Sequence, residues 1–425
     1  RIDFDARSID GAGGTPITGP VFCNRDIGQA GKDWKPYSSI FVTPRSVSPD
    51  EAWLRFGQWN VKGTVFFDNV RLVEVQAVYL AIGDVELGDG ERIDGNRYVF
   101  SAPFNTPYQN QSRPLQTAQC RFNSNRWIFE TNSDVIYRHR IGNRQQTQAN
   151  VETRVSYYTR GELALEVSRD GREWRSLGVQ AGKGIFRCDI PSDLLPAFEI
   201  WVRLSAGDLS KSSQVSDSGL FQVNDFQYRA TVDGPASSVI GKTWYIETAI
   251  ADPNLDVTIG GVGAGIPGAA NIIGALVSNR LQRTISLFPT VTLRQGATES
   301  KSVGQALTLA PGAQGDVNYP YTIPSAGVWN ATFDMGTGSV YRGVFDLNIP
   351  TYYDTGYGER LPSKSSKATL WWASSGWKIP RQRPAPEAKS EAILIRMARN
   401  EAEAAQLVLR PSEVLRGLRI EMGPL

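Results

Sequence analysis

Short stretches in which apolar and polar residues alternate, separated by glycine and proline, constrain this chain more than any other feature. Residues 52–57 and 65–75 alternate with a period of two, and residues 284–293 and 340–349 also favour strands. Such alternation places successive side chains on opposite faces of a strand and is typical of half-buried antiparallel sheets. The 41 Gly and 24 Pro among 425 residues favour many turns over long helices. The sequence therefore predicts an all-β fold of tandem β-sandwich domains.

Four segments of different character follow one another along the chain. Residues 1–76 are short for a sandwich, and we expect the first strands of that module to be missing. Residues 77–233 carry strand candidates and turn signals at fuller length. In residues 236–350 only 13 residues are charged, which fits a spacer sandwich of the immunoglobulin-like kind. A linker rich in Gly, Pro, Ser and Lys follows, and we interpret residues 364–425 as the truncated start of another β-domain.

The histidine content excludes several kinds of active site. His139 is the only histidine, so a two-histidine zinc site cannot form, and a Ser-His-Asp or Cys-His site would depend on this one imidazole. The flanking Arg138 and Arg140 disfavour the charged form of the ring. We therefore expect His139 to be a structural residue.

The cysteines do not indicate a disulfide framework. They are too few and too scattered, and none forms a CxxC motif; they are Cys23, Cys120 and Cys188. Cys120 and Cys188 are a conceivable pair, but spacing alone leaves their redox state open.

Charge and hydropathy argue against nucleic-acid and membrane partners. The formal net charge is +2, from 45 basic and 43 acidic residues, which gives no overall attraction to polyanions. Residues 259–277, within the longest uncharged run, have 6 Gly and only 7 Ile, Leu or Val, so we expect no membrane span. Residues 263–268 match GxGxxG, but no acidic residue occurs between Asp256 and Glu299. A glycine-rich loop is therefore expected there instead of a dinucleotide site.

Aromatic and arginine side chains in the second segment are candidates for sugar binding. Aromatic rings stack on the apolar face of a pyranose, and guanidinium groups bond hydroxyls or an acidic sugar. The candidates are Trp127, Tyr137, Tyr157, Tyr158, Arg138 and Arg140. In an alternating strand Tyr137 and His139 point to one face and the two arginines to the other, so these side chains cannot all serve one site. The alternative is that the aromatic rings fill the sandwich core.

Two acidic residues on the closing strands of the first two segments are candidates for a structural calcium site. Asp68 precedes Asn69, and Asp225 follows Asn224. Oxygen donors suit a hard cation such as calcium, but the same residues commonly cap turns. No cofactor is required by the sequence, and calcium is left as a possibility.

The first two segments resemble jelly-roll carbohydrate-binding modules and the wider galactose-binding-like superfamily. The residues that carry the resemblance are 33–37 and 63–72 in the first segment, and 167–174, a strand, a turn and a Trp, in the second. The resemblance implies jelly-roll sandwiches and a polysaccharide or glycan as partner.

The last segment is similar to the start of the N-terminal β-domain of glycoside hydrolase family 123. The matching residues are 370–373, 377–380 and, above all, 398–411. In that family an aromatic residue usually stands where this chain has Ala402. The resemblance implies strand-turn-strand in residues 398–411, although 402–409 have good helix propensity. It also implies a (β/α)8 barrel further on, with an Asp-Glu pair and substrate assistance on N-acetylhexosaminides. No part of that barrel lies in these residues, so no catalytic residue is carried over.

These observations favour a non-catalytic carbohydrate-binding and spacer region of a secreted, multidomain protein related to glycoside hydrolases. One alternative is a set of structural or adhesion sandwiches on a cell surface, without sugar affinity. Another is an enzyme acting within this chain, for which the sequence offers no paired carboxylates in a recognisable site. Exposed aromatic clusters would favour binding, whereas burial of every Trp would favour a spacer. The oligomeric state is left open.

Overall fold

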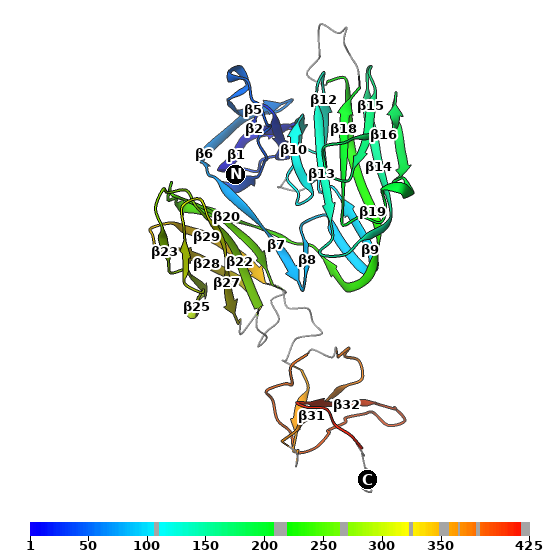
Figure 1. Cartoon of the computed structure of the whole chain (residues 1–425), viewed down its shortest axis with the longest axis vertical. Coiled ribbons are helices and arrows are strands. Elements are labelled where there is room, and N and C mark those ends of the chain that lie inside the picture. Colours follow the sequence, from blue (N-terminus) through cyan, green and yellow to red (C-terminus); the bar gives the residue numbers. More distant parts are fainter. Residues whose placement is uncertain are drawn as a thin grey trace.

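The computed structural model describes residues 1–105, 110–207, 219–263, 271–322, 326–347, 357–363, 366–379 and 383–417. Within these ranges the regular structure consists of strands and two short 3-10 turns, η1 (Pro49–Glu51) and η2 (Ser192–Leu194). The predicted all-β class is confirmed. Figure 1 shows two large sandwich units beside a smaller N-terminal one, with the C-terminal strands at the narrow end of the molecule. We name them the first, second, third and C-terminal units in chain order.

The first unit packs two small sheets around aromatic residues. Ile2, Phe4 and Ala6 of its first strand point inward, as the alternation requires, and Phe4 contacts Phe56 and Phe67. One sheet has the order β4-β1-β6, and β2, β3 and β5 form the other side. The strands are β1 (Ile2–Ala12), β2 (Thr15–Pro20), β3 (Cys23–Asp26), β4 (Lys35–Ser39), β5 (Leu54–Trp59) and β6 (Lys62–Leu72).

The second unit is a sandwich whose two sheets share one large core. One sheet has five strands in the order β10-β13-β18-β15-β16, and the other contains β17-β14-β19-β12-β11, with β9 also paired to β19. The strands are β9 (Glu91–Ser101), β10 (Leu115–Gln119), β11 (Arg121–Asn123), β12 (Arg126–Phe129), β13 (Asp134–Arg140), β14 (Gln146–Tyr158), β15 (Leu163–Ser168), β16 (Arg175–Gln180), β17 (Gly184–Asp189), β18 (Glu199–Ala206) and β19 (Phe221–Ile240).

The first and second units are joined by a continuous sheet. β3 of the first unit pairs in parallel with β11 of the second, Phe122 opposite Cys23. The resulting sheet of nine strands runs from β17 to β5, and Cys23 is buried in the core of the second unit. Because the ladder crosses the expected boundary, residues 1–76 do not form a separate sheet system.

The third unit contains a segment that the sequence assigns to its neighbour. We expect the second module to begin at residue 77, but β7 (Val75–Ile82) pairs with β20 and with β21. β8 (Val85–Leu87) pairs with β7, but the Val85 and Leu87 side chains lie in the core of the second unit, so β7 belongs to the third sandwich and β8 joins the two units. Val78 at the centre of β7 is completely buried. The second unit is therefore inserted between β8 and β20, a topology that no local pattern encodes.

The remaining strands of the third unit follow in sequence after this insertion. Its core contains Trp329, Tyr319, Phe333 and Phe345. The strands are β20 (Thr243–Ile250), β21 (Leu255–Val262), β22 (Asn271–Asn279), β23 (Ile285–Leu287), β24 (Thr290–Gln295), β25 (Thr298–Val303), β26 (Leu307–Leu309), β27 (Gln314–Tyr321), β28 (Gly327–Asp334) and β29 (Val340–Leu347). The GxGxxG match extends beyond the described residues.

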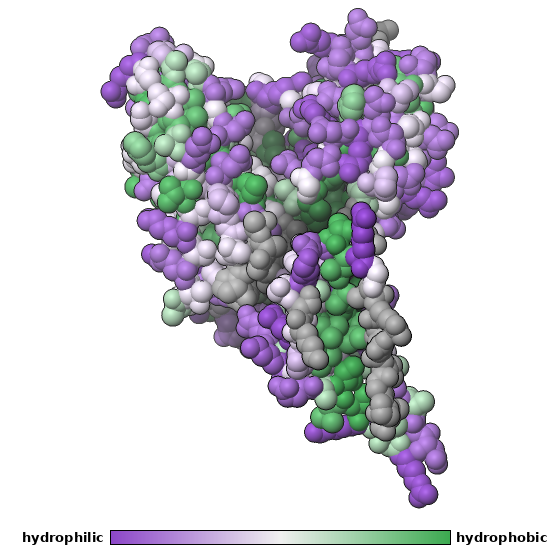
Figure 2. Space-filling model, turned by 60° about the horizontal axis from the view of Figure 1, so that its bottom comes forward, coloured by the Kyte–Doolittle hydropathy of each residue, from purple (hydrophilic) through white to green (hydrophobic). Residues whose placement is uncertain are grey.

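The C-terminal unit is a sheet of three strands, β30 (Glu359–Leu361), β31 (Ala368–Ser374) and β32 (Ala405–Pro411), in that order. β32 lies where helix propensity alone allows a helix, because pairing with β31 gives its backbone hydrogen-bond partners. Residues 392–397 form no strand, although they are rich in apolar residues. Several of their apolar side chains are exposed, and Figure 2 shows hydrophobic residues gathered in a band toward the narrow end of the molecule.

Candidate functional site

Two of the predicted sugar-binding residues are core residues. Trp127 and Tyr137 are both completely buried, and the Trp127 Nε1 donates to the Tyr137 hydroxyl at 3.0 Å. Tyr137 also stacks on Phe226 with ring centroids 4.3 Å apart. A ring enclosed on both faces cannot stack on a sugar, so the sugar-binding prediction for these two residues is wrong and the core alternative holds.

The other predicted residues lie apart from one another. Tyr157 and Tyr158 are half-buried at the end of β14, and the Tyr158 hydroxyl donates to the Gly161 carbonyl at 3.0 Å. Arg138 lies on β13 in the opposite sheet, where its Nε donates to Glu199 at 2.9 Å and its guanidinium covers the Trp201 ring. Arg140 is exposed on the same strand. These side chains therefore do not converge on one site, although the expected division between inward and outward residues of β13 is confirmed.

His139 occupies the same core. It is completely buried and stacks on Tyr228 with ring centroids 3.8 Å apart and an interplanar angle of 2°. Burial, together with the nearby positive charge of Arg113, holds the pKa of the imidazole well below its usual value. A neutral ring without access to solvent has a structural role, as its neighbours in the sequence indicate.

The two calcium candidates do not share a site. Asp68 lies on β6, and its Oδ1 accepts a hydrogen bond from the backbone N–H of Asn69 at 2.7 Å, which is the capping alternative. Asp225 lies on β19 in another sheet, where both carboxylate oxygens are 3.3 Å from Gln227 Nε2. In the described part of the chain no three His, Cys, Asp or Glu side chains are grouped as metal ligands. Calcium binding therefore remains a prediction from the sequence.

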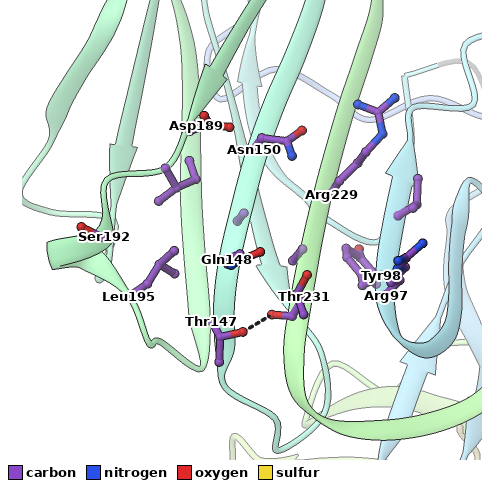
Figure 3. A pocket seen from close by; sticks show the side chains of 14 residues that line it. Arg97, Tyr98, Thr147, Gln148, Asn150, Asp189, Ser192, Leu195, Arg229 and Thr231 are labelled. Atoms are coloured by element: carbon purple, nitrogen blue, oxygen red, sulfur yellow. Dashed lines mark hydrogen bonds between the residues drawn. The ribbon is translucent and has the colours of Figure 1, made fainter.

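A cleft lined by both polar and apolar side chains opens on the outer face of the large sheet of the second unit. Its volume is about 420 Å³, and its floor is formed by β9, β19, β14 and the end of β17. The loop that follows β17 forms one wall with Ile190, Ser192 and Leu195. Figure 3 shows Asp189 and Ser192 on one side, Asn150 and Gln148 in the middle, and Arg229 and Arg97 toward β9.

Strand register places the polar side chains of the cleft in rows. Asn150 is opposite Asp189 on one side and Arg229 on the other. In the next row Thr231 lies between Gln148 and Arg97. The alternation along β14 produces this face, because the intervening Ala149 and Val151 point into the core.

Glu152, a carboxylate beside the cleft, is paired with two arginines. Glu152 accepts from Arg187 Nε at 2.9 Å and lies 3.4 Å from Arg229 Nη1. The hydrogen bond from Arg187, followed by the positive charges of both arginines, lowers the pKa of Glu152. Arg229 also donates to Gln227. This network holds Arg229 in place at the edge of the cleft.

Four polar side chains of the cleft are not engaged with protein. Within the described residues, no hydrogen bond or ion pair involves the side chains of Arg97, Gln148, Asn150 or Asp189. Together they offer guanidinium and amide donors and amide and carboxylate acceptors, which suits a ligand rich in hydroxyl groups. Asp189 is the single carboxylate among the described lining residues, so the cleft lacks the carboxylate pair of glycoside hydrolysis.

None of the residues predicted to bind sugar lines this cleft, because the prediction rested on aromatic side chains and their neighbouring arginines. The usable signal is the row of polar residues at alternate positions from 148 to 154, facing a similar row from 225 to 231. Only the antiparallel register of β14 and β19, which are far apart in the sequence, brings the rows together.

Exposed tryptophans are concentrated in the first unit. Trp59 is 62% exposed, Trp53 is 45% exposed and Trp34 is 41% exposed. The Arg7 guanidinium lies 4.8 Å from the Trp34 ring centroid. The condition expected of a pure spacer, burial of every Trp, is therefore not met.

Comparisons with known proteins show no family for this chain. No family model and no curated protein matches it. No helix in the described ranges has the length and apolar character needed to cross a membrane.

Among solved structures, a β-glucuronidase of Bacteroides uniformis is 12% identical, with a TM-score of 0.17, over 51% of this chain and 26% of its own. The CBM22 tandem domain of Paenibacillus barcinonensis Xyn10C is 10% identical, with a TM-score of 0.19, over 63% of this chain and 93% of its own. A glycosyl hydrolase family 2 member from Bacteroides cellulosilyticus is 7% identical, with a TM-score of 0.18, over 54% of this chain and 29% of its own. This chain thus spans about a quarter of the two enzymes, and likenesses at these TM-scores carry no argument about ligand or activity.

Proposed function

We propose that this region is a non-catalytic glycan-binding module and spacer of a larger, secreted or cell-surface protein related to glycoside hydrolases. The observation that carries the proposal is the cleft on the second unit, where Arg97, Gln148, Asn150 and Asp189 face outward without side-chain partners among the described residues. Polar groups fixed on a rigid sheet lose little conformational freedom when they bind sugar hydroxyls. The resemblance of the last segment to glycoside hydrolase family 123 supports an active site outside this region.

Affinity gel electrophoresis against a panel of polysaccharides tests the proposal. We expect at least one glycan to retard the protein. The double variant Gln148→Ala/Asn150→Ala should weaken retardation about tenfold, because it removes two hydrogen-bonding groups worth about 0.5–1.5 kcal/mol each. Asn330→Ala, an exposed Asn on the third unit, is the matched control and should behave as wild type. Retardation by no glycan, or equal retardation of the double variant, would argue against this site.

The exposed indoles of the first unit favour binding over the adhesion or spacer alternative. The other alternative, an enzyme acting within this chain, is tested by incubating the protein with chromogenic glycosides. We expect no turnover, because the cleft lacks a second carboxylate.

A further inference from the structure

The charged groups of the cleft are separated toward its two ends. Arg97 on β9 and Arg229 on β19 are diagonal neighbours, since Val99 is directly opposite Arg229 and Arg97 is opposite Thr231. Diagonal cross-strand positions lie about 7–8 Å apart, so both residues lie at the same end of the cleft, although the Arg229 guanidinium is directed toward Glu152 and Gln227 and away from Arg97 (Figure 3). Asp189 lies on β17, three strand spacings or about 14 Å away from β9.

The positive end of the cleft is not neutralised by the protein. The nearest engaged carboxylate, Glu152, is already shared between Arg187 and Arg229. Within the described residues Arg97 forms no ion pair. Glu152 is thus engaged by two other arginines, and the Arg97 guanidinium creates a position where an added anion is favourable.

The end of the cleft near Asp189 disfavours an added anion. Asp189 is exposed and accepts no hydrogen bond from a described side chain, so it disfavours a second anion and favours hydroxyl donors. Gln148 and Asn150 lie between the two ends and suit uncharged hydroxyl groups (Figure 3).

We propose that the cleft selects an acidic glycan, with a sugar carboxylate bonded by Arg97 at the arginine end and neutral sugar hydroxyls directed toward Asp189. This inference rests on the proposed glycan-binding function and specifies its ligand class. The arrangement also gives the bound chain one direction along the cleft.

The test uses uronic-acid polysaccharides, each paired with its carboxyl-reduced form, so that only the charge of the ligand differs. The probes are polygalacturonate, alginate, glucuronoxylan and hyaluronan, with neutral xylan and galactan alongside. We expect at least one acidic polymer to retard the protein in affinity gels, its reduced form to do so at least tenfold more weakly, and added salt to weaken retardation.

Variants of the full chain identify the responsible group. Arg97→Gln should weaken binding of the acidic polymer about tenfold or more, as expected when a charge-assisted hydrogen bond is lost. Arg97 has no described partner, so this change leaves the fold intact. Arg154→Gln removes the same charge from the same sheet face, outside the cleft lining, and should change binding less than about twofold.

The outcomes separate the two proposals. Binding of neutral polymers alone, or equal binding of the acidic and reduced forms, overturns the charge selection and leaves the glycan-binding function in place. Equal losses in Arg97→Gln and Arg154→Gln indicate diffuse electrostatic attraction and also overturn it. Absence of binding to any polymer removes both proposals.

Discussion

Glu91 is a carboxylate that the fold buries almost completely at the junction of the second and third units. It accepts two hydrogen bonds of 2.6 Å from the Arg113 guanidinium, one of 2.5 Å from the Tyr98 hydroxyl and one of 2.7 Å from the backbone N–H of Gly88. Its charge raises the pKa of Arg113 despite the burial of that group. A buried charge so fully paired holds β9 against the turn after β8.

Replacing Glu91 by Ala should lower the free energy of unfolding by about 3–5 kcal/mol, because the Arg113 charge would remain buried without its partner. Denaturant titration measures the effect. The matched control, Glu299→Ala, breaks an exposed ion pair with Arg294 and should cost less than about 1 kcal/mol. Equal costs for both variants would show that the buried pair has no special role.

His139 makes the stability of the second unit depend on pH. The pKa of the folded imidazole lies well below 6.5. Between these two pKa values the unfolded state binds a proton and the native state does not. The contribution is therefore fully present above pH 6.5 and is lost as the pH falls toward the folded pKa. The slope is at most about 1.4 kcal/mol per pH unit.

We expect His139→Phe to lose this slope while keeping the ring stack on Tyr228. Neither imidazole nitrogen has a hydrogen-bond partner in the described structure, so replacement by Phe removes no hydrogen bond. Unfolding titrations at about pH 7 and about pH 5 give the difference between wild type and variant, which cancels the other titrating groups. A wild-type protein that loses no more stability than the variant on acidification would contradict the assignment.

At the scale of elements, β19 connects the second unit to the third. This strand of 20 residues pairs with β14 on one side and with β12 and β9 on the other, and β20 follows directly. Gly241 between β19 and β20 donates its backbone N–H to the Glu91 carbonyl at 2.8 Å. A Cβ at this position would lie 2.0 Å from the Gly88 carbonyl oxygen, so only glycine fits without moving the backbone.

Gly241→Ala should therefore destabilise the protein by about 1–3 kcal/mol, as overpacking does in well-packed regions. Gly234→Ala in β19 is the control, because a Cβ there meets no atom within 4 Å. It should change the thermal midpoint little. Similar midpoints for the two variants would refute the close approach of Gly241 to Gly88.

At the scale of the whole molecule, the sheet shared by the first two units makes their stabilities interdependent. Phe122 on β11 is 1% exposed and contacts Trp127 edge-to-face at a centroid distance of 5.0 Å. Its strand is also the one that pairs with β3. The C-terminal sheet, in contrast, pairs only within itself in the described residues.

Phe122→Ala should cost about 3–5 kcal/mol by leaving a cavity in this core. Hydrogen exchange should then accelerate together in β1–β6 and in β12–β19, because both depend on the same ladder. Phe333→Ala, in the core of the third unit, should accelerate exchange mainly in β20–β29. Acceleration confined to one of the first two units in Phe122→Ala would show that the shared sheet does not couple them.

The predictable part of this structure is local. Alternation along single strands correctly assigned the inward Tyr137 and His139 and the outward Arg138 and Arg140. It could not distinguish a ring in a core from a ring on a binding face, because both kinds of face accept aromatic residues; hence the error at Trp127. The helix propensity of residues 402–409 was likewise overridden by pairing with β31.

Residue order and composition were enough to predict the strand class, the inward and outward faces of β13, and the exclusion of a two-histidine metal site. The tertiary structure alone decided that β7 joins β20 across more than 150 residues, that β3 extends the sheet of the second unit, and that β14 and β19 align their polar rows into a cleft. This difference arises because the alternation of apolar and polar residues depends only on the sequence of a single strand. Partner and register are decided instead by the burial and backbone hydrogen bonds gained when distant segments meet.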